Sequence, residues 1–180
     1  MPSTNALLQS ILAASGGGAT GFSKTYHFDA SDAATATTPI THIGAAADTY
    51  LTNDNLGPNS NAYNPDSKDI LWKTGTNKFD FTSLKIGDVV FFRVDLEFSN
   101  AAAQETDIYI SLAEGQTGAY EKLMVHDYHK TAAVDTGLTT SFEMYIGNSI
   151  TKNGGGRFRF ASPVGSSIKV LGWYYRITSV

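Results

Sequence analysis

The chain contains no cysteine and few charged residues. Of its 180 residues, 17% are charged, and lysine and arginine together number 13. The absence of cysteine excludes disulfides and is usual for a protein made in a cytoplasm. The formal net charge is -4 and the sequence has no basic stripe. We therefore expect no nucleic-acid partner, because binding to phosphates needs clustered cations.

Long apolar runs are also missing. No stretch approaches the roughly 20 apolar residues of a membrane-spanning helix, so we expect no insertion into a membrane. The apolar residues from Leu7 to Ala14 follow no basic region and make a poor signal peptide. Synthesis and folding in a cytoplasm is therefore the expectation.

The residue patterns of common active sites are absent as well. There is no G-x-S-x-G motif, and neither Gly16-Gly17-Gly18 nor Gly154-Gly155-Gly156 has the lysine and helix start of a phosphate-binding loop. Asp95 and Glu97 would lie about 7 Å apart on one face of a strand. A solvated strand face explains this pair, so a hydrolase is only the third hypothesis. We expect no enzyme activity, no catalytic residue and no cofactor.

Two groups of polar residues resemble metal ligands without forming a known motif. His126, Asp127 and His129 could hold zinc if they lie on a loop, but no third histidine or cysteine has suitable spacing. Oxygen ligands for calcium are available, without the spacing of a dedicated calcium loop. Capping of turns explains most of them, so no metal site is predicted. These oxygen-bearing residues are Asp29, Asp32, Asn53, Asp54, Asn55, Asp66 and Asp69.

Alternating hydrophobicity predicts an all-β protein. The strongest strand runs from Val89 to Phe98, with five apolar side chains on one face and Arg93, Asp95 and Glu97 on the other. Roughly eight strands with turn signals every 8 to 15 residues favour an antiparallel β-sandwich, with a jelly roll as the best topology and other Greek keys as alternatives. We assign this domain to residues 21–180. The other predicted strands are 22–28, 69–73, 78–81, 108–112, 121–125, 141–146, 157–160 and 168–177.

The first twenty residues form a separate arm in this interpretation. Residues 3 to 14 are the one good helix candidate, and the glycines at 16 to 18 end it with a flexible joint. A helix of this length is marginal alone in water, so it must dock on something. Its own domain, a symmetry axis of an assembly and a larger partner are the alternatives. The candidate attachment residues are Leu7, Leu8, Ile11 and Leu12.

The last strand is apolar on both faces. Ile168 and Val170 alternate with Lys169, but from Leu171 onward large apolar or aromatic groups occupy both faces. Such a strand needs cover on both sides, which a second subunit could provide. A central strand with a bulge at Gly172 that switches faces is the alternative. The candidate subunit interface is Leu171, Trp173, Tyr175 and Ile177.

Three segments of the sequence resemble the C-terminal β-domains of structural proteins in tailed-bacteriophage virions. They read ILWKTGTNKFDFTSLKIGDVVFFRVDLEF, YIGNSITKNGGGRFRF and IKVLGWYYRI, between Ile70 and Ile177. The resemblance implies a virion component, such as a head decoration protein, a head fibre or a tail appendage. Modules of this kind are commonly homotrimers that bind a capsid or tail protein through one end and display the other.

A receptor- or glycan-binding module is the second hypothesis. Several aromatic side chains could stack on the sugars of a host surface glycan, although packing in a core or an interface would use the same rings. The aromatic residues in question are Trp72, Tyr120, Tyr128, Trp173, Tyr174 and Tyr175.

Overall fold

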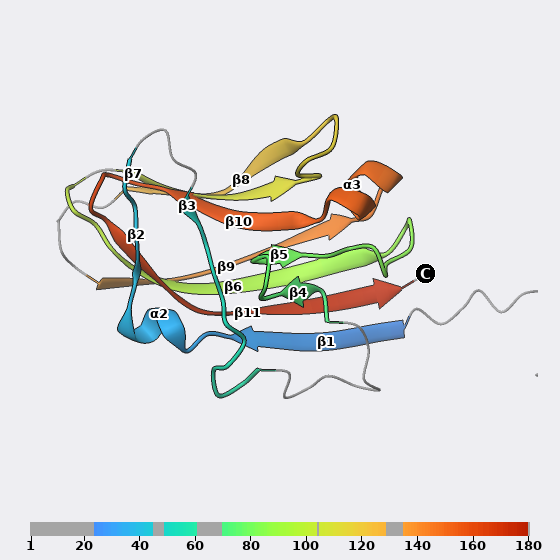
Figure 1. The fold of residues 1–180 in the computed structure, drawn as a ribbon, viewed down its shortest axis with the longest axis horizontal. Coiled ribbons are helices and arrows are strands. Elements are labelled where there is room, and N and C mark those ends of the chain that lie inside the picture. Colours follow the sequence, from blue (N-terminus) through green and yellow to red (C-terminus); the bar gives the residue numbers. More distant parts are fainter. Residues whose placement is uncertain (1–23, 45–48, 61–69, 104, 129–134, 180) are drawn as a thin grey trace, which may run out of the picture.

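The computed structural model describes residues 24–44, 49–60, 70–103, 105–128 and 135–179. Two antiparallel β-sheets pack face to face in this part of the chain (Figure 1). The first sheet has the order β1 (Lys24–Ser31), β11 (Ser167–Ser179), β6 (Val89–Ser99) and β9 (Asp135–Tyr145), with β2 (Ile40–Thr41) beside β11. The second has the order β4 (Trp72–Lys73), β5 (Lys78–Phe79), β10 (Gly156–Ala161), β7 (Glu105–Leu112) and β8 (Tyr120–Tyr128), with β3 (Thr49–Tyr50) beside β10.

The order of the strands is that of a jelly roll. Pairing joins β1 to β11, β5 to β10, β6 to β9 and β7 to β8. The chain is therefore one long antiparallel hairpin, and successive strand pairs along that hairpin alternate between the two sheets. The pairs β11–β6 and β10–β7 then close each sheet. The all-β sandwich predicted from the sequence is confirmed, and the strand order specifies the jelly roll.

The core lies between the two sheets and follows the alternation seen in the sequence. In β6, every second side chain from Val90 to Phe98 is buried, and the charged side chains between them lie on the outer face. The facing strand β10 adds Phe158 and Phe160 from the second sheet. Burial of this kind contributes about 1.5–3 kcal/mol for each large apolar side chain.

Strand β11 is a central strand of the first sheet, between β1 and β6. Its register with β6 shifts between Val170 and Gly172, so the β-bulge of the alternative interpretation is present. Because of this bulge, alternate side chains before and after Gly172 both point into the core. Trp173, Tyr175 and Ile177 are 1%, 0% and 5% exposed, whereas Leu171 is 48% exposed.

This geometry corrects the predicted subunit interface. Trp173, Tyr175 and Ile177 are covered by the second sheet of their own chain and are not available to another subunit. The rings of Trp173 and Trp72 pack edge to face with their centroids 4.6 Å apart. The Tyr175 ring stacks on Phe28 with a centroid distance of 5.0 Å. Leu171 is the one member of the predicted set that stays at the surface.

Short elements complete the fold where the sequence shows no periodic pattern. They are the strands β2 and β3 and the helices α2 (Ala34–Thr37) and α3 (Ser149–Gly154). The side chain of Asn148 caps α3 by accepting a hydrogen bond from the amide of Thr151 at 2.8 Å. The predicted helix over residues 3 to 14, with its candidate attachment residues, lies outside the described residues.

A buried tyrosine ties the short strand β4 to the core. The hydroxyl oxygen of Tyr175 accepts hydrogen bonds from the amides of Leu71 at 3.1 Å and Trp72 at 3.4 Å. Burial raises the pKa of this hydroxyl, so it stays protonated at neutral pH. The tyrosine therefore supplies both a core ring and an acceptor for amides that would otherwise lack one.

The substitution Tyr175→Phe tests this role. It should lower the free energy of unfolding by about 1–3 kcal/mol, because the buried amides of Leu71 and Trp72 lose their acceptor while the core volume hardly changes. Tyr145→Phe is the matched control, since the Tyr145 ring is exposed, and should change stability by less than about 0.5 kcal/mol. Urea unfolding followed by fluorescence measures both. Equal stability of the two variants would contradict this role.

Candidate functional site

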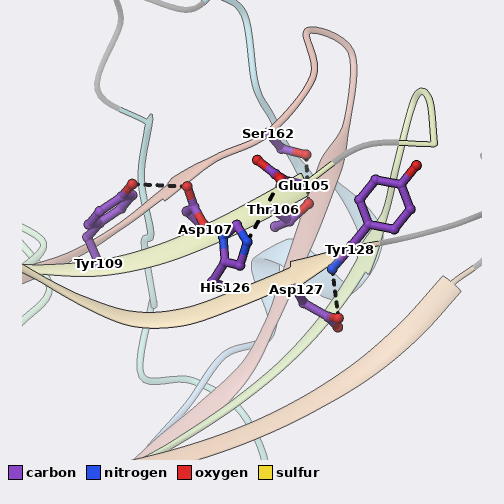
Figure 2. A network of polar contacts seen from close by, with 8 residues as sticks. All are labelled: Glu105, Thr106, Asp107, Tyr109, His126, Asp127, Tyr128 and Ser162. Carbon is purple, nitrogen blue, oxygen red and sulfur yellow. Dashed lines mark hydrogen bonds and ion pairs between the residues drawn. The ribbon is translucent and has the colours of Figure 1, made fainter.

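An ordered polar network occupies one end of the outer face of the second sheet (Figure 2). Strands β7 and β8 place Asp107 opposite His126 and Glu105 opposite Tyr128. Directly opposed residues of an antiparallel pair project from the same face, so these four side chains form one group. The buried residues Thr106 and Ile108 alternate with the two carboxylates and point to the core, which fixes the group on the outside.

Asp107 is the centre of this network. Its Oδ1 lies 2.7 Å from Nδ1 of His126, and its Oδ2 accepts a hydrogen bond from the Tyr109 hydroxyl at 3.0 Å. The Arg159 guanidinium in turn lies over the Tyr109 ring, with its Cζ atom 4.5 Å from the ring centroid. Arg159 Nε donates to Glu121 Oε1 at 2.9 Å. Asp107 is thus held in one orientation by His126 on β8 and by Tyr109 on its own strand β7.

The network shifts two pKa values in predictable directions. The hydrogen bond to Asp107 raises the pKa of His126, and the charges of Asp107, Glu105 and Asp127 raise it further. Burial raises the pKa of the Tyr109 hydroxyl, and its hydrogen bond to Asp107 adds to that rise. His126 therefore keeps its proton to a higher pH than a free histidine does.

A hollow of about 680 Å³ opens beside this group, and we call it the β7–β8 trough. The turn after β10 forms its far wall. Ser162 in that turn lies 3.0 Å from the Thr106 hydroxyl, which also bonds to Asn100 at 3.2 Å, so the wall is anchored to the sheet. The Tyr128 ring stands at the opposite side, beside Glu105 (Figure 2). The lining residues are Ala103, Glu105, Asp107, Tyr128, Ala161, Ser162, Pro163 and Val164.

The residues considered for zinc are only partly described by the structure. His126 lies on strand β8 and contacts Asp107 and, at 3.9 Å, Glu105, while His129 is outside the described residues. Within the described ranges, no group of three or more histidine, aspartate and glutamate side chains is arranged to hold a metal ion.

Two of the residues considered for calcium bind the backbone instead, while Asp66 and Asp69 lie outside the described residues. Asp54 accepts hydrogen bonds from the amides of Ala33, Ala34 and Leu56, all at 2.9 Å. Burial would raise the pKa of Asp54, but these hydrogen bonds lower it. Asp32 accepts from the Thr35 amide at 2.7 Å, so both carboxylates cap turns as the sequence suggests.

The carboxylate pair on β6 is part of a solvated ionic face. Asp95 accepts from Arg93 Nε at 3.0 Å and from the Thr139 hydroxyl at 2.8 Å, and Glu97 pairs with Lys169. Each carboxylate therefore has its own partner on the outer face of the first sheet. The arrangement favours the solvated strand face over paired acid–base chemistry.

The aromatic residues considered for glycan contact separate into two groups. Trp72, Trp173 and Tyr175 are core residues and are removed from any surface role. Tyr128 and Tyr120 lie at opposite ends of β8 and are 56% and 50% exposed. Tyr174 is half-buried on the outer face of the first sheet, beside His27.

The end of the sandwich opposite the trough exposes large apolar side chains. Lys24 at the start of β1 pairs with Ser179, and Val89 at the start of β6 pairs with Tyr145, so β1 and β6 both begin at this end (Figure 1). Ile86, Tyr145 and Ile150 are exposed here. An apolar hollow of about 140 Å³ lies nearby, lined by residues that include Tyr26, Phe28, Leu84 and Ile177. We call this the entry end.

The trough was not visible in the sequence, although one signal of it was present. Glu105 and Asp107 alternate with Thr106 just before an apolar strand run, which places both carboxylates on one face. The sequence shows neither the register with β8 nor the position of the turn after β10. Those two features bring Tyr128 and Ser162 to the same place.

No protein-family model matches the chain, and no curated protein matches it in sequence. Among solved structures it is similar to the Eiger TNF of S. frugiperda, at 11% identity and a TM-score of 0.45, over 89% of this chain and 94% of that one. It is also similar to a chain in the structure of the Gx strain of infectious bursal disease virus. That match has 12% identity and a TM-score of 0.39, over 88% of this chain and 33% of that one.

The helices that the structure describes are too short and too polar to span a lipid bilayer.

The His126–Asp107 pair predicts a pH dependence. Because the folded protein raises the pKa of His126, the stabilisation from the charged pair is complete below the ordinary histidine pKa of about 6.5 and is lost as the pH rises through the raised value. Asp107→Asn should lower the pKa of His126, as measured by NMR titration of the imidazole. Glu143→Gln, on the first sheet, should leave it unchanged. An identical His126 titration in wild type and Asp107→Asn would contradict the prediction.

Proposed function

We propose that this protein is a non-enzymatic structural subunit of a virion, either a capsid decoration protein or an appendage. In this proposal the β-sandwich assembles with copies of itself, as a homotrimer, and the N-terminal segment attaches it to a capsid or tail protein. The protein is made in the cytoplasm of the host and then becomes part of the particle. The resemblance of residues 70–177 to the β-domains of tailed-bacteriophage structural proteins supports the virion assignment.

The observation that carries the proposal is the composition of the entry end. Ile86, Tyr145 and Ile150 are large apolar side chains left in solvent at the end where the N-terminal segment joins β1. Exposed apolar groups gathered in one region of a soluble domain favour a contact surface. Their position at the end where β1 begins supports contact with a larger particle at that end. Symmetric repetition would strengthen each weak contact through avidity.

Self-association is the first test. The full chain should sediment as a homo-oligomer at micromolar concentration, and Leu171→Ser should shift it toward smaller species, because Leu171 is the exposed member of the predicted interface. Ile43→Ser is the matched control, since Ile43 is also an exposed apolar residue, and should leave the assembly unchanged. A stable monomer in analytical ultracentrifugation would contradict the assembly.

Attachment is the second test. Deletion of residues 1 to 18 should leave the β-sandwich folded, as judged by circular dichroism, and abolish binding to capsids or tails of the virus that encodes the chain. The combined substitution of Ile86, Tyr145 and Ile150 by serine should weaken binding by more than about tenfold, because each buried apolar side chain contributes about 1.5–3 kcal/mol. Cosedimentation with the particles measures both effects, again with Ile43→Ser as the control. Unchanged binding after the deletion would contradict attachment through the N-terminal segment.

A further inference from the structure

We propose that the β7–β8 trough binds a saccharide that carries no negative charge. In this assignment a sugar ring packs on the Tyr128 ring, and its hydroxyl groups donate hydrogen bonds to Glu105 and Asp107. The proposal goes beyond assembly and attachment and does not depend on either of them.

The shape of the trough suits a ligand of this size. Its volume of about 680 Å³ falls within the range of about 300–1,000 Å³ that is typical of small-molecule sites. Strands β7 and β8 supply its floor and one wall, and the turn at Ser162 supplies the other wall. Sites formed by strands and anchored turns hold their groups in place before the ligand arrives, which reduces the ordering cost of binding.

Tyr128 provides an apolar surface that is more than half exposed. The ring is 56% exposed although it stands on a paired strand, opposite Glu105 in the register. One face of a pyranose ring carries mainly C–H groups, and these pack well on a flat aromatic ring. Such a ring next to hydrogen-bond acceptors matches the two-sided character of a sugar, which is apolar on its faces and polar around its edge.

Glu105 and Asp107 provide the acceptors. Ionised carboxylates are acceptors only, with about four lone-pair sites each, so sugar hydroxyls are suitable donors to them. Asp107 uses one oxygen for His126 and the other for Tyr109, which orients it and leaves further lone pairs available. Glu105 is closest to His126 at 3.9 Å, so it is less constrained and can adjust to the ligand.

The charge of the trough excludes anions from this assignment. Among the residues that the structure describes, its lining contains two carboxylates and neither lysine nor arginine. An acidic sugar or a phosphate would meet like charges there, whereas a neutral sugar or one with a protonated amine would not. An amine could also lie over the Tyr128 ring as a cation–π contact.

The location of the trough makes it accessible in an attached subunit. Glu105 begins β7 and Tyr128 ends β8, at the end of the sandwich away from Lys24 and Ser179 (Figure 1). A subunit held at the entry end would therefore present the trough outward. Repetition of the site in an assembly would raise the avidity for a polysaccharide surface.

A glycan array probed with the full-length assembled protein tests the proposal. Titration calorimetry then measures binding in solution to hexamers of N-acetylglucosamine (neutral), glucosamine (cationic) and galacturonate (anionic). We expect the glycans that bind the protein on the array, here called retained glycans, to be neutral or amine-bearing. Tyr128→Ala and Glu105→Gln should each weaken binding of the retained glycans by about tenfold or more, since each removes one of the two recognition elements. Tyr128→Phe should keep the affinity, because the ring and not the hydroxyl makes the contact.

Tyr120→Ala is the matched control, because Tyr120 is similarly exposed at the other end of β8 and should not affect binding. An array without retained glycans, as expected for a polypeptide receptor, would overturn the proposal. Preference for acidic glycans, or unchanged affinity of Tyr128→Ala, would also overturn it. Sedimentation of Tyr128→Ala separates the two proposals. Loss of glycan binding with an intact oligomer supports the role of the trough and leaves the assembly unaffected. A wild-type monomer that still binds glycans contradicts the assembly and leaves the trough proposal intact.

Discussion

The bulge at Gly172 is the constraint on which the rest of the sandwich depends. Strand β11 has 13 residues, pairs with β6 along most of its length and pairs with β1 from Gly172 to Ser179. Without the register shift, every second side chain along the whole strand would face the core. Ile168 and Trp173, which are five residues apart, would then point to opposite faces. The bulge brings both inward. It therefore permits one strand to supply aliphatic packing at one end of the core and aromatic packing at the other.

The aromatic half of β11 joins the two sheets. Trp173 contacts Trp72, Phe79 and Phe158, which all come from the second sheet. Tyr175 adds hydrogen bonds to the amides of β4, so a strand of only two residues is tied to the core by side chains. Rings held between the sheets thus form the aromatic part of a core that also contains many buried aliphatic side chains.

The sequence predicted where the regular strands lie because their side chains report burial directly, although β8 and β9 are each longer than predicted. The strand from Val89 to Phe98 alternates in the structure as it does in the sequence, within one residue of the observed β6. The doubly apolar segment was harder, because an apolar face does not reveal what covers it. A neighbouring sheet and a neighbouring subunit predict the same pattern, and only the register shift at Gly172 distinguishes them. The short strands β2 and β3 are set by pairing with β11 and β10, which local patterns do not encode.

The trough illustrates the same limit for surface chemistry. Glu105 and Asp107 are close in sequence, but Tyr128 and Ser162 reach them through strand pairing and a turn that lie far along the chain. The jelly-roll path makes this convergence possible, because the long hairpin returns β8 and β10 to either side of β7. The same path places the first residue of β1 at the opposite end of the sandwich. One topology thus separates the end where β1 begins from the end with the polar network and an exposed ring, and attachment at the first would leave the second free.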